Sequence, residues 1–377
     1  MISRRQFLRN GSSALVAGAV SPVLSAGLRR DSTSRRLLVV VELNGGNDAL
    51  NTVIPVRDDR YYAARPTLAI PRRSALMLDG DVGLHPSMTA MRELYEKGKL
   101  AIIQGVGYPN SSRSHFRSME VWHRGDTAEA ISGGWLGRVF GRLAGAESTV
   151  PALHFGRSLP NMFAGPGARA VSVSTSDDLF PTYQHAEPVA VGSNCDGLER
   201  GCELVRRAMA SPRTARATYP MGRLGEGLAL FAQMIMEDAG TRLFYISVGG
   251  FDTHARQADS HGRLLRNVSS AVGAFVRDLE AEGRDRDVMV MMFSEFGRRL
   301  KENTSAGTDH GTAGVMFVAG GSVRGGMYGA RPSLSDMDGP DLKHTTDFRG
   351  CYSTLAGWLG IQAKFGIEMS DVRYGFA

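Results

Sequence analysis

Apolar residues along this chain form short continuous runs, each followed by a turn rich in Gly or Asn and then by a helical pattern. Such runs begin near residues 37, 100, 241, 287 and 311. After the third run, Leu265, Val268, Val272 and Phe275 recur at helical spacing and predict a helix from about residue 260 to 282. Buried strands that alternate with helices are typical of a mainly parallel sheet. We therefore expect a doubly wound α/β fold with helices on both faces of one sheet.

The middle of the chain, from about residue 145 to 225, follows a different pattern. It is richer in Gly, Ser, Pro and Arg and less periodic than its surroundings. No repeat, coiled coil or low-complexity block divides the chain. We interpret the middle region as an insertion or cap within a single domain of residues 29–377.

The first 28 residues have the three-part pattern of a twin-arginine export signal. The motif SRRQFLR, with Arg4 and Arg5, precedes a modest apolar stretch at 14–20 and small residues around 25–27. The apolar stretch is too short to span a membrane. We expect residues 1–28 to be a signal peptide read by the twin-arginine export machinery, and the mature protein to be periplasmic or extracellular.

The positive net charge of +6 belongs to this N-terminal region. Seven of the 44 basic residues and one of the 38 acidic residues lie in residues 1–36, so the rest of the chain has 37 of each and no formal net charge. A neutral body has no general attraction for polyanions. We therefore expect no nucleic acid as a partner.

Three cysteines allow one pair at most. Cys195 and Cys202 flank a polar loop and could form a local disulfide in an oxidising compartment, or stay as structural thiols. The chain has no CxxC motif, so a thiolate zinc site is not expected.

Residues with metal-binding or nucleophilic chemistry follow the predicted strands, where ligands bind in open α/β sheets. In chain order they are Asp48; Ser111, Ser112, Ser114 and His115; Asp252 and His254; Glu295 and Arg298; and Asp309 and His310. Carboxylate oxygens and imidazole nitrogens together suit a divalent metal such as zinc, manganese or iron. In an extended segment Asp252 and His254 point to the same side, so both could reach one ion.

Each of these residues also has an ordinary structural explanation. Asp48 and Asp252 are common turn and cap residues, and Glu295 and Arg298 could form a structural ion pair. The gathering of all of them at one predicted edge favours a joint site. The GGND turn lacks both the GxGxxG pattern and the Walker lysine, so it does not indicate nucleotide binding.

The serine cluster precedes a predicted helix. A hydroxyl in the first helical turn lies near free backbone N–H groups and the positive end of the helix dipole, and a nearby metal would lower its pKa further. Helix capping is one alternative. A Ser-His-Asp triad with His115 as the base is another, but the chain has no GxSxG elbow.

Six motifs in order resemble those of the exported bacterial family known as domain of unknown function 1501. They are SRRQFLR, LNGGNDALNTVIP, GYPNSSRSHFRSMEVW, GGFDTH, SEFGR and TDHG. The resemblance runs from about residue 37 to the C-terminus. That family is in turn similar to the alkaline phosphatase and sulfatase superfamily, which implies an alkaline-phosphatase-like sheet.

The resemblance also implies roles for particular residues. Asp48 would be the first acidic ligand and Ser114 the nucleophile, with Ser111 and Ser112 as its alternatives. The remaining metal ligands would be Asp252, His254, Glu295 and His310. This chain departs from the superfamily pattern in two places: only Thr253 separates Asp252 from His254, and Ser294–Glu295 stands where an Asp-His pair is common. Both a two-metal site and a one-metal site with an arginine anion clamp therefore stay open.

The resulting hypothesis is an exported hydrolase of phosphate or sulfate esters. A metal-activated serine would attack phosphorus or sulfur, while the metal and Arg298 offset the charge on the nonbridging oxygens. The substrate would be a small-molecule or envelope-associated ester, with a co-exported protein as a further candidate partner. The alternative is a non-catalytic cell-envelope binding or assembly protein on the same fold.

Overall fold

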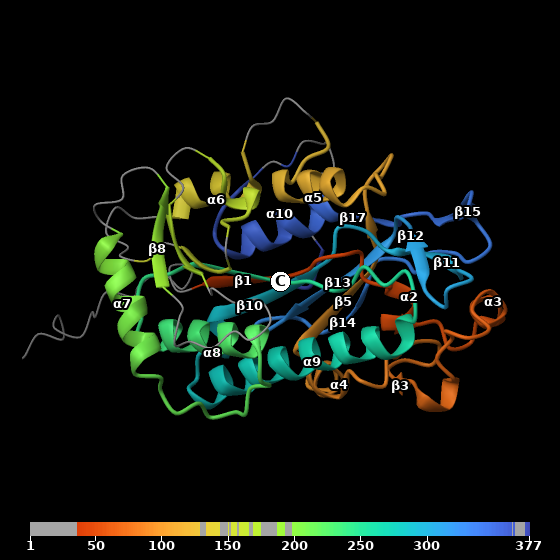
Figure 1. The fold of residues 1–377 in the computed structure, drawn as a ribbon, viewed down its shortest axis with the longest axis horizontal. Helices are drawn as coiled ribbons and strands as arrows, with labels where there is room; N and C mark the ends of the chain where they lie inside the picture. The colour runs from red at the N-terminus through yellow and green to blue at the C-terminus, as the bar shows by residue number, and fades with distance from the viewer. Residues whose placement is uncertain are drawn as a thin grey trace, which may run out of the picture.

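The structure is a computed structural model. It describes residues 36–128, 133–143, 150, 152–156, 158–165, 169–174, 187–192, 198–363, 365 and 374–377. In this part of the chain ten strands form one sheet, with helices on both faces (Figure 1). The predicted signal peptide lies outside the described residues.

Parallel strands form the centre of the sheet. β1 (Leu37–Leu43) lies between β10 (Val288–Phe293) and β9 (Leu243–Val248), and β6 (Ala152–Phe155) pairs with the other side of β9. Every residue of β1 is buried, because both faces of the sheet are covered. This double burial explains why the sequence shows a continuous apolar run instead of an alternating one.

On the β10 side the sheet becomes mixed. β13 (Gly314–Ala319) pairs antiparallel with β10, and β5 (Leu100–Gly107) pairs antiparallel with β13, so β5 runs in the direction of β1. β14 (Gly326–Tyr328) and β17 (Thr346–Asp347) add to β5 in parallel. The predicted fold class, a mainly parallel sheet in an α/β fold, is confirmed. The carboxyl ends of β1, β5, β9 and β10 share one edge.

Two layers of helices enclose the sheet, as Figure 1 shows. One layer consists of α4 (Thr89–Glu96), α8 (Arg223–Met236) and α9 (Gln257–Ala281), and the other of α5 (His115–Arg124), α6 (Trp135–Leu143) and α10 (Phe348–Trp358). Alternate residues of β1 serve the two cores: Val39 and Val41 face one, Leu38 and Val40 the other. The helix predicted near residues 260–282 is α9.

The described part of residues 145–225 extends the central sheet. β6, β7 (Arg169–Ser174) and β8 (Glu187–Gly192) continue the sheet beyond β9, and α7 (Glu199–Ala210) follows them. The interpretation of this region as a cap missed these strands, because they are short and lack the apolar run of β1. Cys202 is buried in α7, while Cys195 lies outside the described residues, so the local disulfide stays a prediction.

Shorter elements surround the carboxyl edge. They are α2 (Ala49–Thr52), α3 (Asp59–Ala64), the three strands β2 (Val53–Ile54), β3 (Leu76–Met77) and β4 (Gly83–Leu84), the pair β11 (Arg298–Glu302) and β12 (Thr308–His310), and the pair β15 (Met337–Asp338) and β16 (Asp341–Leu342). Within the described ranges, no helix has the length and apolar character needed to cross a lipid bilayer.

Candidate metal centre

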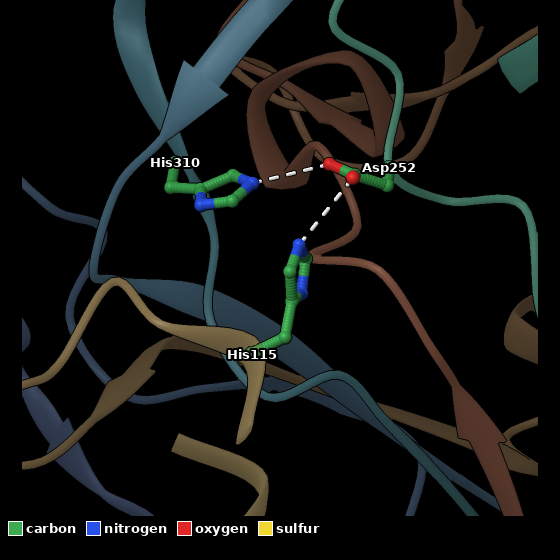
Figure 2. Close-up of side chains that lie close together, drawn as sticks. All are labelled: His115, Asp252 and His310. Atoms are coloured by element: carbon green, nitrogen blue, oxygen red, sulfur yellow. Dashed lines mark hydrogen bonds and ion pairs between the residues drawn. The ribbon is translucent and has the colours of Figure 1, made fainter. Parts of the chain in front are cut away.

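Three side chains from distant segments meet at the carboxyl edge of the sheet (Figure 2). His115 begins α5, Asp252 follows β9 and His310 ends β12. One possible ligand atom from each lies within 4.8 Å of the others. His310 Nε2 is 3.1 Å from Asp252 Oδ1, and His115 Nε2 is 3.4 Å from Asp252 Oδ2. Two imidazoles and a carboxylate form a donor set that zinc, manganese or iron can use.

His254 lies beside this cluster, in contact with two of its three members. Its Nε2 atom lies 2.8 Å from Nε2 of His310 and 3.0 Å from Oδ1 of Asp252. Two imidazole lone pairs at this distance repel each other unless a proton or a cation lies between them. The sequence prediction that Asp252 and His254 reach a common point agrees with this geometry.

The opposite nitrogen of each imidazole faces an acceptor. Nδ1 of His115 is 2.8 Å from Oε1 of Glu295, and Nδ1 of His310 is 2.8 Å from the carbonyl oxygen of Arg113. Nδ1 of His254 lies 3.6 Å from a carboxylate oxygen, Oδ1 of Asp309. An N–H at Nδ1 leaves the lone pair on Nε2, which is the arrangement that metal-binding histidines use.

Two further observations test whether a metal fits. Nε2 of His115 is buried and has no hydrogen-bond partner among the described residues, so an ion would satisfy it. Burial by itself would raise the pKa of Asp252, but the hydrogen bond from Arg298, the contact with His310 and nearby positive charge lower it to about 2. Asp252 is therefore ionised at neutral pH. The residues present fit a divalent metal.

Glu295 lies behind His115. Its side chain is fully buried and accepts hydrogen bonds from the backbone N–H of Gly45 at 2.9 Å and from Ser294 Oγ at 3.0 Å. The resemblance assigned Glu295 to the metal. Together with the bond from His115, these contacts instead engage its carboxylate in hydrogen bonds within the protein. The geometry gives Glu295 the position of a residue that orients a ligand.

Arg298 organises the loops below the cluster. Its side chain has no exposed surface, and it donates hydrogen bonds to backbone carbonyl oxygens of neighbouring loops and to Asp252 Oδ1 at 2.7 Å. The carbonyl groups belong to Gly45, Gly46, Phe251 and Thr308. Because these bonds occupy its guanidinium group, Arg298 holds Asp252 and the loops in place and does not face the open side.

Asp48 lies outside the cluster and caps α2. Its buried carboxylate accepts hydrogen bonds from the backbone N–H of Leu50 and Asn51 and forms a 2.6 Å ion pair with Arg65. Gln257 also donates to it. Burial alone would raise the pKa of Asp48, but the charge and hydrogen bond of Arg65 outweigh burial and lower it. Nothing in the sequence pattern had indicated Arg65 or Gln257 as its partners.

The serines occupy the start of α5. Ser114 is the exposed N-cap residue, and its hydroxyl makes no capping hydrogen bond within the described structure. Ser112 Oγ instead accepts a hydrogen bond from the backbone N–H of Ser114 at 3.2 Å. Ser114 stands between Arg113, whose carbonyl holds His310, and His115. Of the three candidate serines, it has the shortest chain connection to the cluster.

A second buried carboxylate, which was not predicted as a site residue, fixes the other end of α5. Glu42, the sixth residue of β1, accepts a hydrogen bond from Nε2 of His123 at 2.8 Å. Burial would raise the pKa of Glu42, but bonds from His123 and Tyr245 lower it. Glu295 and Glu42 thus hold the two ends of the helix that carries Ser114 and His115.

The fold and this cluster define the class of the protein: an α/β protein with a mixed, mostly parallel sheet and a candidate metal centre at the carboxyl ends of its strands. The family model described as "Protein of unknown function (DUF1501)" matches residues 35–358. The chain therefore belongs to that family, and the assignment from its six motifs is confirmed. Among curated proteins, no match was found.

Solved structures similar to this chain include sulfatases and members of the alkaline phosphatase superfamily. A 2-O GAG sulfatase is 10% identical with a TM-score of 0.44, covering 91% of this chain and 75% of its own. The C-terminal periplasmic domain of EcEptC from Escherichia coli, in complex with Zn, is 8% identical with a TM-score of 0.41, covering 87% and 84%. An alkaline phosphatase superfamily protein from Vibrio parahaemolyticus is 11% identical with a TM-score of 0.38, covering 89% and 70%.

Proposed function

We propose that this protein is a metal-dependent hydrolase of phosphate or sulfate esters in which Ser114 is the nucleophile. The observation that carries the proposal is the position of Ser114. Its neighbour on one side anchors His310, and its neighbour on the other side is itself a member of the cluster. The residue that carries this exposed hydroxyl is therefore bonded in the chain to two residues that form or anchor the candidate metal centre.

The metal would be held by the cluster of His115, Asp252 and His310, with the neighbouring His254 as a further candidate ligand. A bound ion of this kind would lower the pKa of a nearby hydroxyl and offset negative charge on an ester. At the start of α5, the backbone N–H groups of the first turn have no intrahelical acceptors. They support binding of an anionic ester group next to Ser114.

The setting of this activity belongs to the same proposal. The protein would act in the periplasm or outside the cell after twin-arginine export, on a small-molecule or envelope-associated ester. A co-exported protein is a candidate partner. The SRRQFLR motif and the neutral charge of the remaining chain support this setting.

Metal analysis and turnover assays with aryl phosphate and aryl sulfate esters test the proposal. Ser114→Ala should keep the metal and lose turnover, whereas Ser112→Ala, two residues earlier, should keep both. Wild-type protein that contains no metal and hydrolyses neither ester across a range of added divalent ions would reject the proposal.

The second candidate function is a non-catalytic binding or assembly protein of the cell envelope that keeps one structural metal. The structural use of Asp48 and Arg298 favours it, since both carry buried hydrogen-bond networks. Asp252→Ala separates the two functions. A variant with a lower melting temperature, together with a wild type that has no activity, would support the binding protein. A variant that folds normally but has lost the turnover of the wild type would support the hydrolase.

A further inference from the structure

Two arginines meet on a single carboxylate beside the metal cluster. Nη1 of Arg113 lies 3.2 Å from Oδ2 of Asp341, and Nε of Arg299 lies 3.5 Å from Oδ1 of the same residue. Because the two guanidinium groups approach the two oxygens of one carboxylate, they face the same small region. Asp341 itself is largely buried, with 10% of its side chain exposed.

This pair adjoins the candidate metal centre through the backbone. The carbonyl oxygen of Arg113 accepts the hydrogen bond from Nδ1 of His310. Arg299 directly follows Arg298, and its Nη1 lies 3.6 Å from Oδ2 of Asp309, the neighbour of His310. Oδ1 of the same Asp309 lies 3.6 Å from Nδ1 of His254, so a single side chain separates Arg299 from His254 beside the cluster.

The two arginines differ from Arg298 in how much of their bonding capacity is in use. The Arg298 side chain is fully buried and bonded to several loops, whereas those of Arg113 and Arg299 are 47% and 32% exposed. Their ion pairs of 3.2–3.6 Å are long compared with the roughly 2.7–2.9 Å of strong charge-assisted hydrogen bonds. Since a guanidinium group has five N–H donors, both arginines can bind a further anion.

We propose that Arg113 and Arg299 form the anion-binding site of this protein and bind the nonbridging oxygens of a phosphate or sulfate group. Asp341 holds the two guanidinium groups together when no anion is bound. The identity of the anion as the ester group of a substrate rests on the proposed function. Arg113 and Arg299 thus have the anion-clamp role that was predicted for Arg298. Arg298 is instead a positioning residue that holds Asp252 and the neighbouring loops.

Calorimetric titration of the full-length folded protein with inorganic phosphate and inorganic sulfate tests this site. Arg113→Ala and Arg299→Ala should each weaken binding by about tenfold or more, and the double variant further, as expected for lost charge-assisted hydrogen bonds. Arg113→Lys should restore part of the affinity. Arg117→Ala is the matched control, because Arg117 is a half-exposed arginine of α5 that pairs with Glu120.

Chelator-treated protein separates the arginines from the metal. Phosphate should still bind to it, and the double variant should lose this residual binding while still unfolding in one cooperative transition. Its melting temperature should fall, because Asp341, with 10% of its side chain exposed, loses both arginine partners. A double variant that binds phosphate as tightly as the wild type, with or without metal, would overturn the inference. Wild-type protein that binds phosphate through these arginines yet hydrolyses no ester would reject the proposed function and leave the anion site standing.

Discussion

The orientation of His115 is set from behind by Glu295. A carboxylate that accepts the Nδ1 proton of a metal-binding imidazole fixes its tautomer and makes Nε2 more basic. The bond between these two side chains is 2.8 Å, and the Glu295 side chain is fully buried. We therefore expect Glu295 to raise the affinity of the candidate site for a metal without contacting the ion.

We expect Glu295→Gln to lower metal affinity by about 10- to 100-fold while the candidate ligands themselves remain. The amide keeps an acceptor for His115 but removes the negative charge. Chelator competition with zinc or manganese measures the change. Glu280→Gln, a surface substitution at a residue paired with Lys99, should leave the affinity unchanged; equal affinities of both variants would contradict the positioning role.

Two roles have been considered for Asp48, metal ligand and buried helix cap, and one substitution distinguishes them. Because the carboxylate is buried against Arg65, Asp48→Asn should lower the free energy of unfolding by about 3–5 kcal/mol, as for a broken buried ion pair. Metal content should stay the same. Urea unfolding and metal analysis measure the two quantities.

A second N-cap aspartate, Asp58 of α3, provides the control for Asp48. Its partner Arg60 is exposed, so Asp58→Asn should cost far less than Asp48→Asn, since asparagine also caps helices well. Loss of metal from the Asp48 variant without a loss of stability would return Asp48 to the ligand set.

At the scale of elements, the loops of the carboxyl edge pack backbone against backbone. A Cβ atom at Gly45 would lie 2.3 Å from the backbone nitrogen of Asp252, and one at Gly307 would lie 2.2 Å from the carbonyl carbon of His254. Gly45 also has φ +121°, which a residue with a side chain rarely adopts. The loop after β1 thus fixes the loop after β9 by contact.

Gly45→Ala should therefore displace Asp252 and cost about 1–3 kcal/mol in backbone strain, with the steric clash in addition. We expect both a lower melting temperature and lower metal occupancy. Gly249→Ala is the matched control because nothing lies within 4 Å of its added Cβ. A Gly45→Ala protein with normal metal occupancy would show that the two loops move independently.

At the scale of the whole molecule, three buried histidines link stability to pH. Burial lowers the pKa of His85, His154 and His261 to about 4, below the ordinary 6.5. The unfolded chain therefore binds their protons first as the pH falls. Their contribution to stability is complete above about pH 6.5 and is lost as the pH falls towards 4.

Each of these histidines should add up to about 1.4 kcal/mol per pH unit to the slope of unfolding free energy within that range. Urea unfolding at several pH values between about 7.5 and 5 measures the slope. Replacing His85 or His261 by Gln should flatten it. If the wild type and both variants show the same slope, His85 and His261 do not cause the pH dependence of stability.

The parallel centre of the fold could be predicted because β1, β9 and β10 are buried on both faces and leave continuous apolar runs. The closeness of Asp252 and His254 followed from their alternating positions after one strand, whereas His310 was assigned to the same site by the family resemblance. The burial of Arg298 could not be predicted, because most of its acceptors are backbone carbonyl groups. Every residue has such a group, so the sequence does not show which ones Arg298 binds. β6 to β8 were missed since short strands at the side of a sheet carry a weak pattern.

The candidate metal ligands come from three segments that become neighbours only when the sheet that contains β5, β9 and β10 has formed. An unfolded chain therefore offers no such cluster to an ion. If the twin-arginine signal directs export after folding, the ion is taken from the cytoplasmic metal pool and carried outwards with the protein. Rerouting the same chain through a pathway for unfolded polypeptides should then change which element it contains, and elemental analysis of the two products would reveal where the protein had folded.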